Sequence, residues 1–281
     1  METDCVPVAV PIIKRARGYR LYDRQGRRYL DLYRDGGGTL LGHRAGSTVT
    51  LMKSVLSQGL ASAIPSVWES RLIKAIASLI PGHTIVRLFA SRARALEAVS
   101  RFLGMRVELS DLNDPALTAG PGLGLSRALL WRPFLPEPDP AVAAQIPVLP
   151  ILPLTICEAP APVCFPDAQD GEVPASDRLP GFILAGASSA LVWLRTGGEK
   201  HRFAPHDAIQ RAIDRSSGWA RIGPYVSVTC RVSEYAGVFA EFLRAGVLLS
   251  PSYPGPSILP GECSPGEAKL LAALFLRFPG G

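Results

Sequence analysis

The stretch 18-GYRLYDRQGRRYLDLYRDGGGTLLGH-43 decides the fold of this chain. It predicts two short strands, over 19–21 and 28–32, joined by a reversal at Asp23–Gly26. The aspartate and the glycine suit the reversal, because aspartate bonds to nearby backbone amides and glycine accepts a positive φ. The glycine run 36–38 suits neither a strand nor a helix. It indicates backbone that lies close to another backbone or to a ligand.

Composition predicts a well-packed globular protein of one large domain or two unequal ones. The 281 residues are 47% hydrophobic and only 19% charged. No apolar run is long enough to cross a membrane, and the order of charges in the first 17 residues is the reverse of a signal peptide. We therefore expect a cytoplasmic protein with no membrane contact.

The chain is basic, with a net charge of +6 and a pI near 9.2, which raises the question of nucleic-acid binding. Most basic residues are spread along the chain, and only the stretch from Lys14 to Arg34 is dense. No nucleic-acid motif accompanies this stretch. We favour a solvated face there, and a basic nucleic-acid-binding module stays open as an alternative.

The cysteines and histidines predict no metal site. The five cysteines are scattered without the short spacings of a zinc site. His201 and His206 are five residues apart, which places them on different faces of a helix. We expect the thiols to be small, mostly buried side chains.

After the opening stretch, the pattern predicts an α/β arrangement. Helical spacing of apolar residues runs over 49–60 and over 67–80, and Ser66 with Glu69 has the pattern of a capping box. A buried strand over 85–89 and a helix over 96–103 follow.

From 110 to 178 the periodicity is lost, and we expect this region to be irregular. Two apolar runs stand out in it, 128–131 and 146–157. The second contains Pro150 and Pro153, so it is at best an edge or bulged strand.

Regular patterns return in the last hundred residues. Helices are expected over 182–194 and 205–213, and a strand is expected over 225–232. A helix from Ser233 and a strand over 246–249 follow. The last element is a buried helix over 268–276, which opens on the capping-box pair Ser264 and Glu267. We divide the chain into an N-terminal segment (1–60), a reduced large α/β domain (61–195) and a small C-terminal domain (196–281).

The opening stretch resembles the N-terminal signature of class III aminotransferases, the pyridoxal-phosphate enzymes that include glutamate-1-semialdehyde aminomutase and the acetylornithine, ornithine and 4-aminobutyrate aminotransferases. The matching residues are Gly18, Asp23, Gly26, Tyr29-Leu30-Asp31, Gly36 to Gly38 and Gly42-His43. The resemblance implies an α/β, shortened fold type I architecture with a C-terminal α+β small domain. It also implies a subunit interface at the N-terminal part, and hence a homodimer or a pair with a related chain.

The resemblance also implies a place for the cofactor. In the family, a Ser-Gly-Thr-Glu-Ala run at a helix N-terminus holds the phosphate of pyridoxal phosphate. The aligned run here is Ser91-Arg92-Ala93-Arg94-Ala95, so the candidate cofactor-binding residues are Ser91, Arg92 and Ala93. The run Thr155–Pro160 is similar to a family strand that ends in Glu-Pro.

Other family residues have no match here. These are the aromatic residue that stacks on the cofactor ring and the aspartate that pairs with its nitrogen. The chemistry needs a lysine amine to hold the aldehyde of the cofactor, and of the five lysines only Lys200 lies near the position that the family's order of motifs implies.

The leading hypothesis is a degenerate protein without transaminase activity, with a structural or regulatory role. The alternative is a divergent pyridoxal-phosphate aminotransferase or aminomutase that uses Lys200 or a partner chain's lysine.

Overall fold

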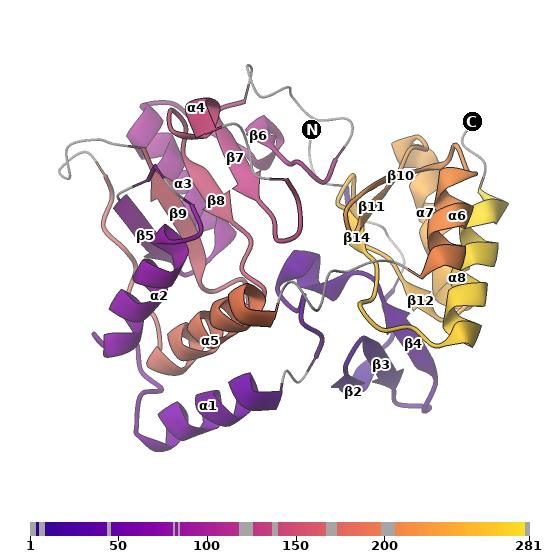
Figure 1. Cartoon of the computed structure of the whole chain (residues 1–281), viewed down its shortest axis with the longest axis horizontal. Coiled ribbons are helices and arrows are strands. Elements are labelled where there is room, and N and C mark those ends of the chain that lie inside the picture. Colours follow the sequence, from indigo (N-terminus) through magenta and orange to yellow (C-terminus); the bar gives the residue numbers. More distant parts are fainter. Residues whose placement is uncertain are drawn as a thin grey trace. The chain divides into compact units, whose positions relative to one another are not determined.

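The computed structural model describes residues 4–5, 9–43, 46–80, 82–83, 85–117, 126–136, 140–166, 173–197 and 206–278. The chain forms two compact units (Figure 1). Unit 1 comprises residues 1–44, 116–118 and 199–281, and unit 2 comprises residues 45–115 and 119–198. The two ends of the chain therefore build one unit, and its middle builds the other.

Unit 2 is built on a five-stranded mixed sheet in the order β5-β9-β8-β7-β6. Strand β9 is antiparallel to both of its neighbours, whereas β8, β7 and β6 run parallel to one another. The strands are β5 (Ile85–Phe89), β6 (Leu112–Asn113), β7 (Ala128–Trp131), β8 (Val148–Pro150) and β9 (Ala161–Phe165).

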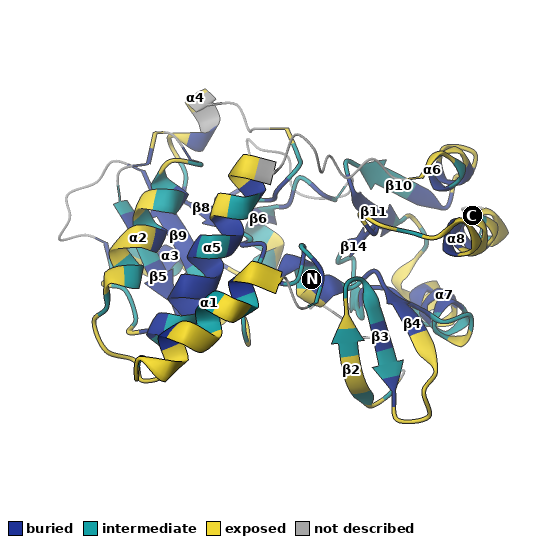
Figure 2. Cartoon of the chain, turned by 60° about the horizontal axis from the view of Figure 1, so that its bottom comes forward, coloured by how far each residue is buried: buried dark blue, intermediate teal, exposed yellow. Residues whose placement is uncertain are grey.

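Helices bury both faces of this sheet, as expected for an α/β layer structure. On one face, α2 and α5 enclose a core that includes Leu72, Val148 and Leu184. On the other face, α3 covers a second core that includes Val99 and Phe165. The helices are α1 (Gly46–Ser57), α2 (Val67–Ala77), α3 (Arg92–Leu103), α4 (Pro140–Ala143) and α5 (Gly181–Gly197), with a 3-10 turn η2 at Leu109–Asp111. Figure 2 shows α5 buried over most of its length and α1 largely exposed.

The expectation of an irregular region over 110–178 differs from the structure, which has four of the five sheet strands within it. Strands β6 to β8 are only two to four residues long. Such short strands carry too few residues for a period to be recognised. The predicted edge strand over 146–157 is wrong as well, because β8 lies between β7 and β9. Pro150 is tolerated there since it is the last residue of the strand.

Unit 1 contains two sheets and a short ribbon. The four-stranded sheet has the order β12-β4-β3-β2, and the three-stranded sheet has the order β10-β11-β14. The strands are β2 (Ile13–Arg17), β3 (Arg20–Asp23), β4 (Arg28–Asp31), β10 (Trp219–Ile222), β11 (Tyr225–Val228), β12 (Val247–Leu248) and β14 (Ser257–Ile258); β1 (Asp4–Cys5) pairs with β13 (Ser252–Tyr253). The parallel pair β4–β12 joins the two ends of the chain.

Three helices and the sheets of unit 1 share one core, in which Trp219, Phe242 and Phe275 pack their rings together. The helices are α6 (Asp207–Asp214), α7 (Val232–Arg244) and α8 (Pro265–Arg277). The last helix begins with the predicted capping box: the Ser264 hydroxyl accepts from the Glu267 amide, and the Glu267 carboxylate accepts from the Ser264 amide. The helix is buried on one face only, since Lys269 is exposed.

Two further details differ from the sequence expectations. The strand predicted over 225–232 ends at Val228, because α7 already begins at Val232. The predicted capping box at the start of α2 does not form: Ser66 occupies the N-cap position, but its buried hydroxyl has no hydrogen-bond partner among the described residues.

Candidate functional site

The start of α3 follows the carboxyl end of β5, where the candidate cofactor residues lie. Ser91 is the N-cap residue, and its hydroxyl accepts from the Arg94 amide at 3.2 Å. A β-strand that turns into a helix at a serine cap is the geometry expected for this run. Ser91 and Arg92 are half-buried, and Ala93 is exposed.

The first carboxylate at this helix start comes from Glu158. Its Oε2 accepts from the Arg92 amide at 3.2 Å. Glu158 occupies a tight turn in which Ile156 and Ala159 exchange backbone hydrogen bonds of 2.8 and 3.0 Å. The run Thr155–Pro160, compared above with a family strand, is therefore this turn. Cys157 is exposed in it, contrary to the expectation of buried thiols, whereas Cys164 is buried.

This turn is strained. Both of its central residues, Cys157 and Glu158, have positive φ angles, of 50° and 67°. A residue other than glycine in this conformation costs about 1 kcal/mol or more. The strain aims the Glu158 side chain at the first turn of α3.

The second carboxylate comes from Asp177. Its Oδ2 accepts from the Ala90 amide at 3.0 Å, and its Oδ1 accepts from the Arg94 guanidinium at 3.0 Å. This guanidinium lowers the pKa of Asp177 below its usual range, and the aspartate in turn raises the pKa of Arg94. The Asp177 amide also donates to the Leu88 carbonyl, so the carboxylate is held by its own backbone as well. We call Glu158 and Asp177 the acidic pair.

The arrangement does not fit a cofactor phosphate. Three backbone donors at this helix start, the amides of Ala90, Arg92 and Arg94, already have partners within the chain. A phosphate placed there would also lie beside two carboxylates, and like charges in contact repel. The favourable charge that a helix N-terminus offers to an anion is used by the chain's own acidic side chains.

The lysines within the described residues have solvent-exposed side chains. Lys14, Lys53, Lys74 and Lys269 are all exposed. Lys53 and Lys74 belong to unit 2 and lie on the outward sides of α1 and α2. Lys200, the candidate catalytic residue, lies outside the described residues. No group of three or more His, Cys, Asp or Glu in the described part of the chain could hold a metal ion.

The sequence pattern did not reveal the acidic pair. Glu158 and Asp177 are far from Ser91 along the chain and lie in the region without periodicity. Two signals existed. Glu158 precedes Ala159-Pro160 after an apolar run, and two arginines, Arg92 and Arg94, open a helix that has no acidic residue in its first turn. Such a helix start attracts carboxylates from elsewhere in the fold.

The opening stretch is built around an arginine buried in unit 1. Arg34 donates to the carbonyls of Leu40 and Leu259 at 2.9 Å, and its guanidinium lies 3.9 Å over the Tyr19 ring. The glycine run that follows has positive φ angles at Gly36 and Gly37. His43 Nε2 lies 2.7 Å from an Asp31 carboxylate oxygen. Within this stretch, backbone lies close to backbone at Gly42, where an added Cβ atom would lie 3.0 Å from the Gly18 carbonyl oxygen. The expectation for the glycine run 36–38 stays a prediction.

Comparison with known proteins agrees with this architecture. No family model matches the chain. An uncharacterised protein of Treponema pallidum is 30% identical over 272 residues, which cover 88% of each chain. A glutamate-1-semialdehyde 2,1-aminomutase of Ruminiclostridium cellulolyticum is 33% identical over 89 residues, which cover 32% of this chain and 20% of the enzyme.

Among solved structures, a glutamate-1-semialdehyde aminomutase from Pseudomonas aeruginosa superposes with a TM-score of 0.70 at 12% identity. The match covers 95% of this chain and 87% of the enzyme. The expected class III aminotransferase fold is therefore confirmed. No helix in the described residues has the length and apolar character that crossing a membrane requires.

Proposed function

The chain belongs to one family with the Treponema pallidum protein and has the fold of the class III aminotransferases, but we propose that it does not transaminate. It acts as a structural or regulatory protein that pairs with a second copy of itself or with a related aminotransferase-like chain. The alternative is a divergent pyridoxal-phosphate aminotransferase or aminomutase. The observation that carries the proposal is the acidic pair at the start of α3.

The acidic pair removes the anchor on which the cofactor depends. A phosphate ester would have to displace Glu158 from the Arg92 amide and Asp177 from the Ala90 amide. Displacement would also break the ion pair between Asp177 and Arg94. Pyridoxal phosphate, when bound, would supply an electron sink for amino-group chemistry, and the protein's part would be to bind and orient its phosphate and ring.

A spectroscopic experiment tests the proposal. The purified protein is mixed with pyridoxal phosphate, and the absorbance is recorded before and after borohydride reduction. We expect the parent protein to show no stronger Schiff-base band than a Lys53→Ala control variant, which lacks one exposed amine. A band that borohydride fixes and that Lys200→Ala abolishes would establish the alternative, and turnover of an amino donor would do the same.

A stability experiment tests the role given to the acidic pair. Asp177→Asn removes the charge that pairs with Arg94, so we expect a loss of about 1 kcal/mol in the free energy of unfolding. Glu69→Gln is the matched control, because Glu69 forms a longer ion pair, of 3.7 Å, with the exposed Arg178 in the same unit. Equal, negligible losses in the two variants would contradict the role.

The pairing with another chain has a candidate surface in unit 2. Three large apolar residues are exposed around the connection between α1 and α2: Leu56, Ile64 and Val67, at 40%, 47% and 62%. Exposed apolar residues gathered in one place are typical of protein interfaces. We expect Ile64→Glu with Val67→Glu to shift the protein from dimer to monomer in sedimentation experiments. Val232→Glu, at an apolar residue in unit 1 that is 46% exposed, is the control.

A further inference from the structure

The net charge of the chain resides entirely in unit 1. That unit holds 18 Lys and Arg against 12 Asp and Glu, a net charge of +6, whereas unit 2 holds 12 of each and is neutral. The sequence alone showed basic residues spread along the chain, because the two ends that form unit 1 are far apart in it. The fold gathers this charge into one body.

Within unit 1, one face of the four-stranded sheet carries a row of planar side chains. Arg15 pairs with Tyr22 across β2 and β3, and Tyr22 pairs with Arg28 across β3 and β4. Residues directly opposite on neighbouring strands point to the same face, so the three side chains form a row. The Arg15 guanidinium lies 4.3 Å over the Tyr22 ring.

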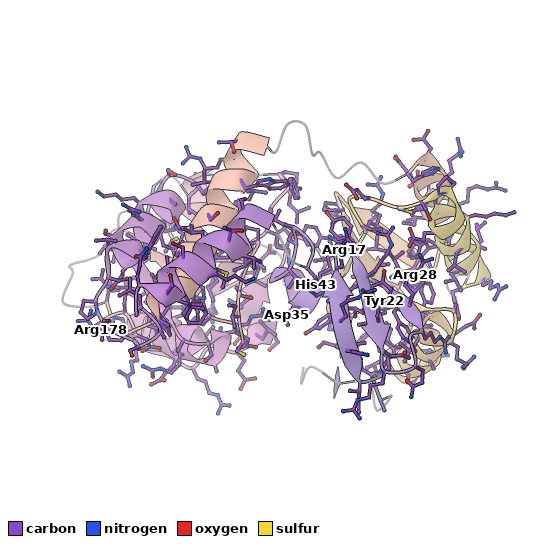
Figure 3. The ribbon with its side chains drawn as sticks, turned by 90° about the horizontal axis from the view of Figure 1, so that it is seen from below. Arg17, Tyr22, Arg28, Asp35, His43 and Arg178 are labelled. Carbon is purple, nitrogen blue, oxygen red and sulfur yellow. The ribbon has the colours of Figure 1, made fainter. Side chains whose placement is uncertain are left out.

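The same face carries two more arginines. Arg17 is two residues after Arg15 on β2, and Arg20 is two residues before Tyr22 on β3, so both share the side of the row. Figure 3 shows Arg17, Tyr22 and Arg28 over this sheet. On the opposite face, Ala16, Leu21 and Tyr29 pack into the unit 1 core. The face of the row is buried at one place as well, because Leu30, directly opposite Arg20, belongs to the same core.

Two exposed arginines of this face have no carboxylate partner among the described residues. In unit 2, the exposed arginines Arg94, Arg101 and Arg178 each form an ion pair with a carboxylate. In contrast, Arg15 and Arg17 form no ion pair with any described acidic residue, and both are exposed. Arg28 is 57% exposed, and its guanidinium is 3.8 Å from Glu267, which is already bound by Arg20 at 2.6 Å.

We propose that the sheet face formed by Arg15, Arg17, Tyr22 and Arg28 binds single-stranded nucleic acid. This goes beyond the proposed structural role and does not depend on it. Unpaired arginines offer planar forks that match phosphate oxygens, and guanidinium and phenol planes offer stacking surfaces to unpaired bases. A second copy of this chain does not suit the face, since two such faces would oppose like charges.

The spacing suits an extended strand. Alternate residues on a β-strand are about 6.6 Å apart, and neighbouring strands are about 4.8 Å apart. Arg15 and Arg17 therefore place two cations along one strand, and Arg28 places a third two strands away. The three positions form a triangle, whose cations the phosphates of one flexible single strand contact by bending around it.

The test is fluorescence anisotropy of the full-length protein with a labelled single-stranded oligonucleotide over a range of salt concentrations. We expect the logarithm of the association constant to fall linearly with the logarithm of the salt concentration. The variant with Arg15→Ala, Arg17→Ala and Arg28→Ala should lose at least tenfold in affinity at low salt. Its slope should decrease by about 2, since each phosphate contact on a single strand contributes about 0.7.

The matched control removes the same charge from unit 2 with Arg101→Ala, Arg106→Ala and Arg178→Ala, all at exposed positions. We expect its affinity to stay within about twofold of the parent protein. An equal loss in both triple variants would attribute the binding to net charge and overturn the proposal. So would an absence of binding at low salt, or binding to anionic vesicles without binding to the oligonucleotide.

A Tyr22→Phe and Tyr22→Ala pair separates stacking from charge. Tyr22→Phe keeps the ring and should bind like the parent protein, whereas Tyr22→Ala should weaken binding several-fold without changing the salt slope. Thermal unfolding of each variant verifies that it is folded. A Tyr22→Ala variant that is folded and binds unchanged would refute the stacking role of the ring.

Discussion

At the scale of single residues, unit 1 depends on polar side chains that are placed where an apolar residue would be expected. Only 1% of Arg34 is exposed. Burial lowers its pKa to about 10, which leaves the guanidinium charged at neutral pH. Three of its nitrogens donate to the carbonyls of Asp31, Leu40 and Leu259. The charge is tolerated because these carbonyls and the Tyr19 ring solvate it.

We expect Arg34→Ala to destabilise the protein by about 3–5 kcal/mol, because it leaves buried carbonyls without donors and opens a cavity. Chemical denaturation measures the loss. Arg24→Ala is the control: Arg24 is exposed at the hairpin turn, and its substitution should change the free energy of unfolding by less than about 0.5 kcal/mol. Similar values for the two variants would refute the structural role of Arg34.

Glu267 makes the stability of unit 1 dependent on pH. Its hydrogen bonds with the Arg20 guanidinium lower its pKa to about 2, from an ordinary 4.5. A carboxyl with a lowered pKa stabilises the folded state above its ordinary pKa, and this contribution is lost as the pH falls toward 2. Because Arg20 is 24% exposed and solvent screens the pair, we expect a contribution of about 2 kcal/mol.

The measurement is the difference in free energy of unfolding between the parent protein and Glu267→Gln. This difference should be constant above about pH 5 and should vanish near pH 2. A difference that persists at pH 2 would show that the Glu267 charge is not its source.

At the scale of elements, α1 packs on α5 through a glycine. A Cβ atom built on Gly186 would lie 2.7 Å from the Met52 sulfur and 3.1 Å from a Leu154 methyl. The close approach of these two helices therefore requires the absence of a side chain at this position. Gly237 in α7 differs, because nothing lies within 4 Å of its added Cβ.

We expect Gly186→Val to destabilise the protein by about 1–3 kcal/mol through overpacking, and the addition of Met52→Ala to recover part of this loss. Gly237→Ala should instead stabilise the protein by about 0.5–1 kcal/mol, because alanine is the better helix former and has space there. Thermal unfolding of the four proteins measures both effects. A stabilising Gly186→Val would contradict the packing described for α1 and α5.

The sequence predicted the long elements well and the short ones poorly. Helices such as α3 and α5 repeat their apolar period over three or more turns, and the hairpin β3–β4 has a clear turn at Asp23–Gly26. Strand β8, three residues long, presents no period at all. At the start of α3, the family resemblance placed Ser91 at a helix N-terminus. The carboxylates at this helix start were not predicted, because contacts between distant loops follow from tertiary structure alone.

At the scale of the whole molecule, the division into two units predicts unequal independence. Unit 2 is nearly one continuous stretch of chain with both faces of its sheet covered by its own helices. We expect the fragment 45–198 to fold by itself with a cooperative thermal transition, as compact domains do. Neither fragment 1–44 nor fragment 199–281 should fold alone, because each lacks a part of the shared unit 1 core. A fragment 45–198 without a cooperative transition would refute this independence.

The parallel pairing of β4 with β12, in which Leu30 lies opposite Val247, has a consequence for biosynthesis. Ribosomes add about 5–20 residues per second. Strands β2–β4 are therefore synthesised up to tens of seconds before their partner strand, β12. During this interval the edge of β4 carries unpaired amides and carbonyls, which recruit other chains readily. The rate of translation between β4 and β12 should therefore affect the yield of soluble protein. Slow translation of the middle of the mRNA should favour aggregation of nascent chains.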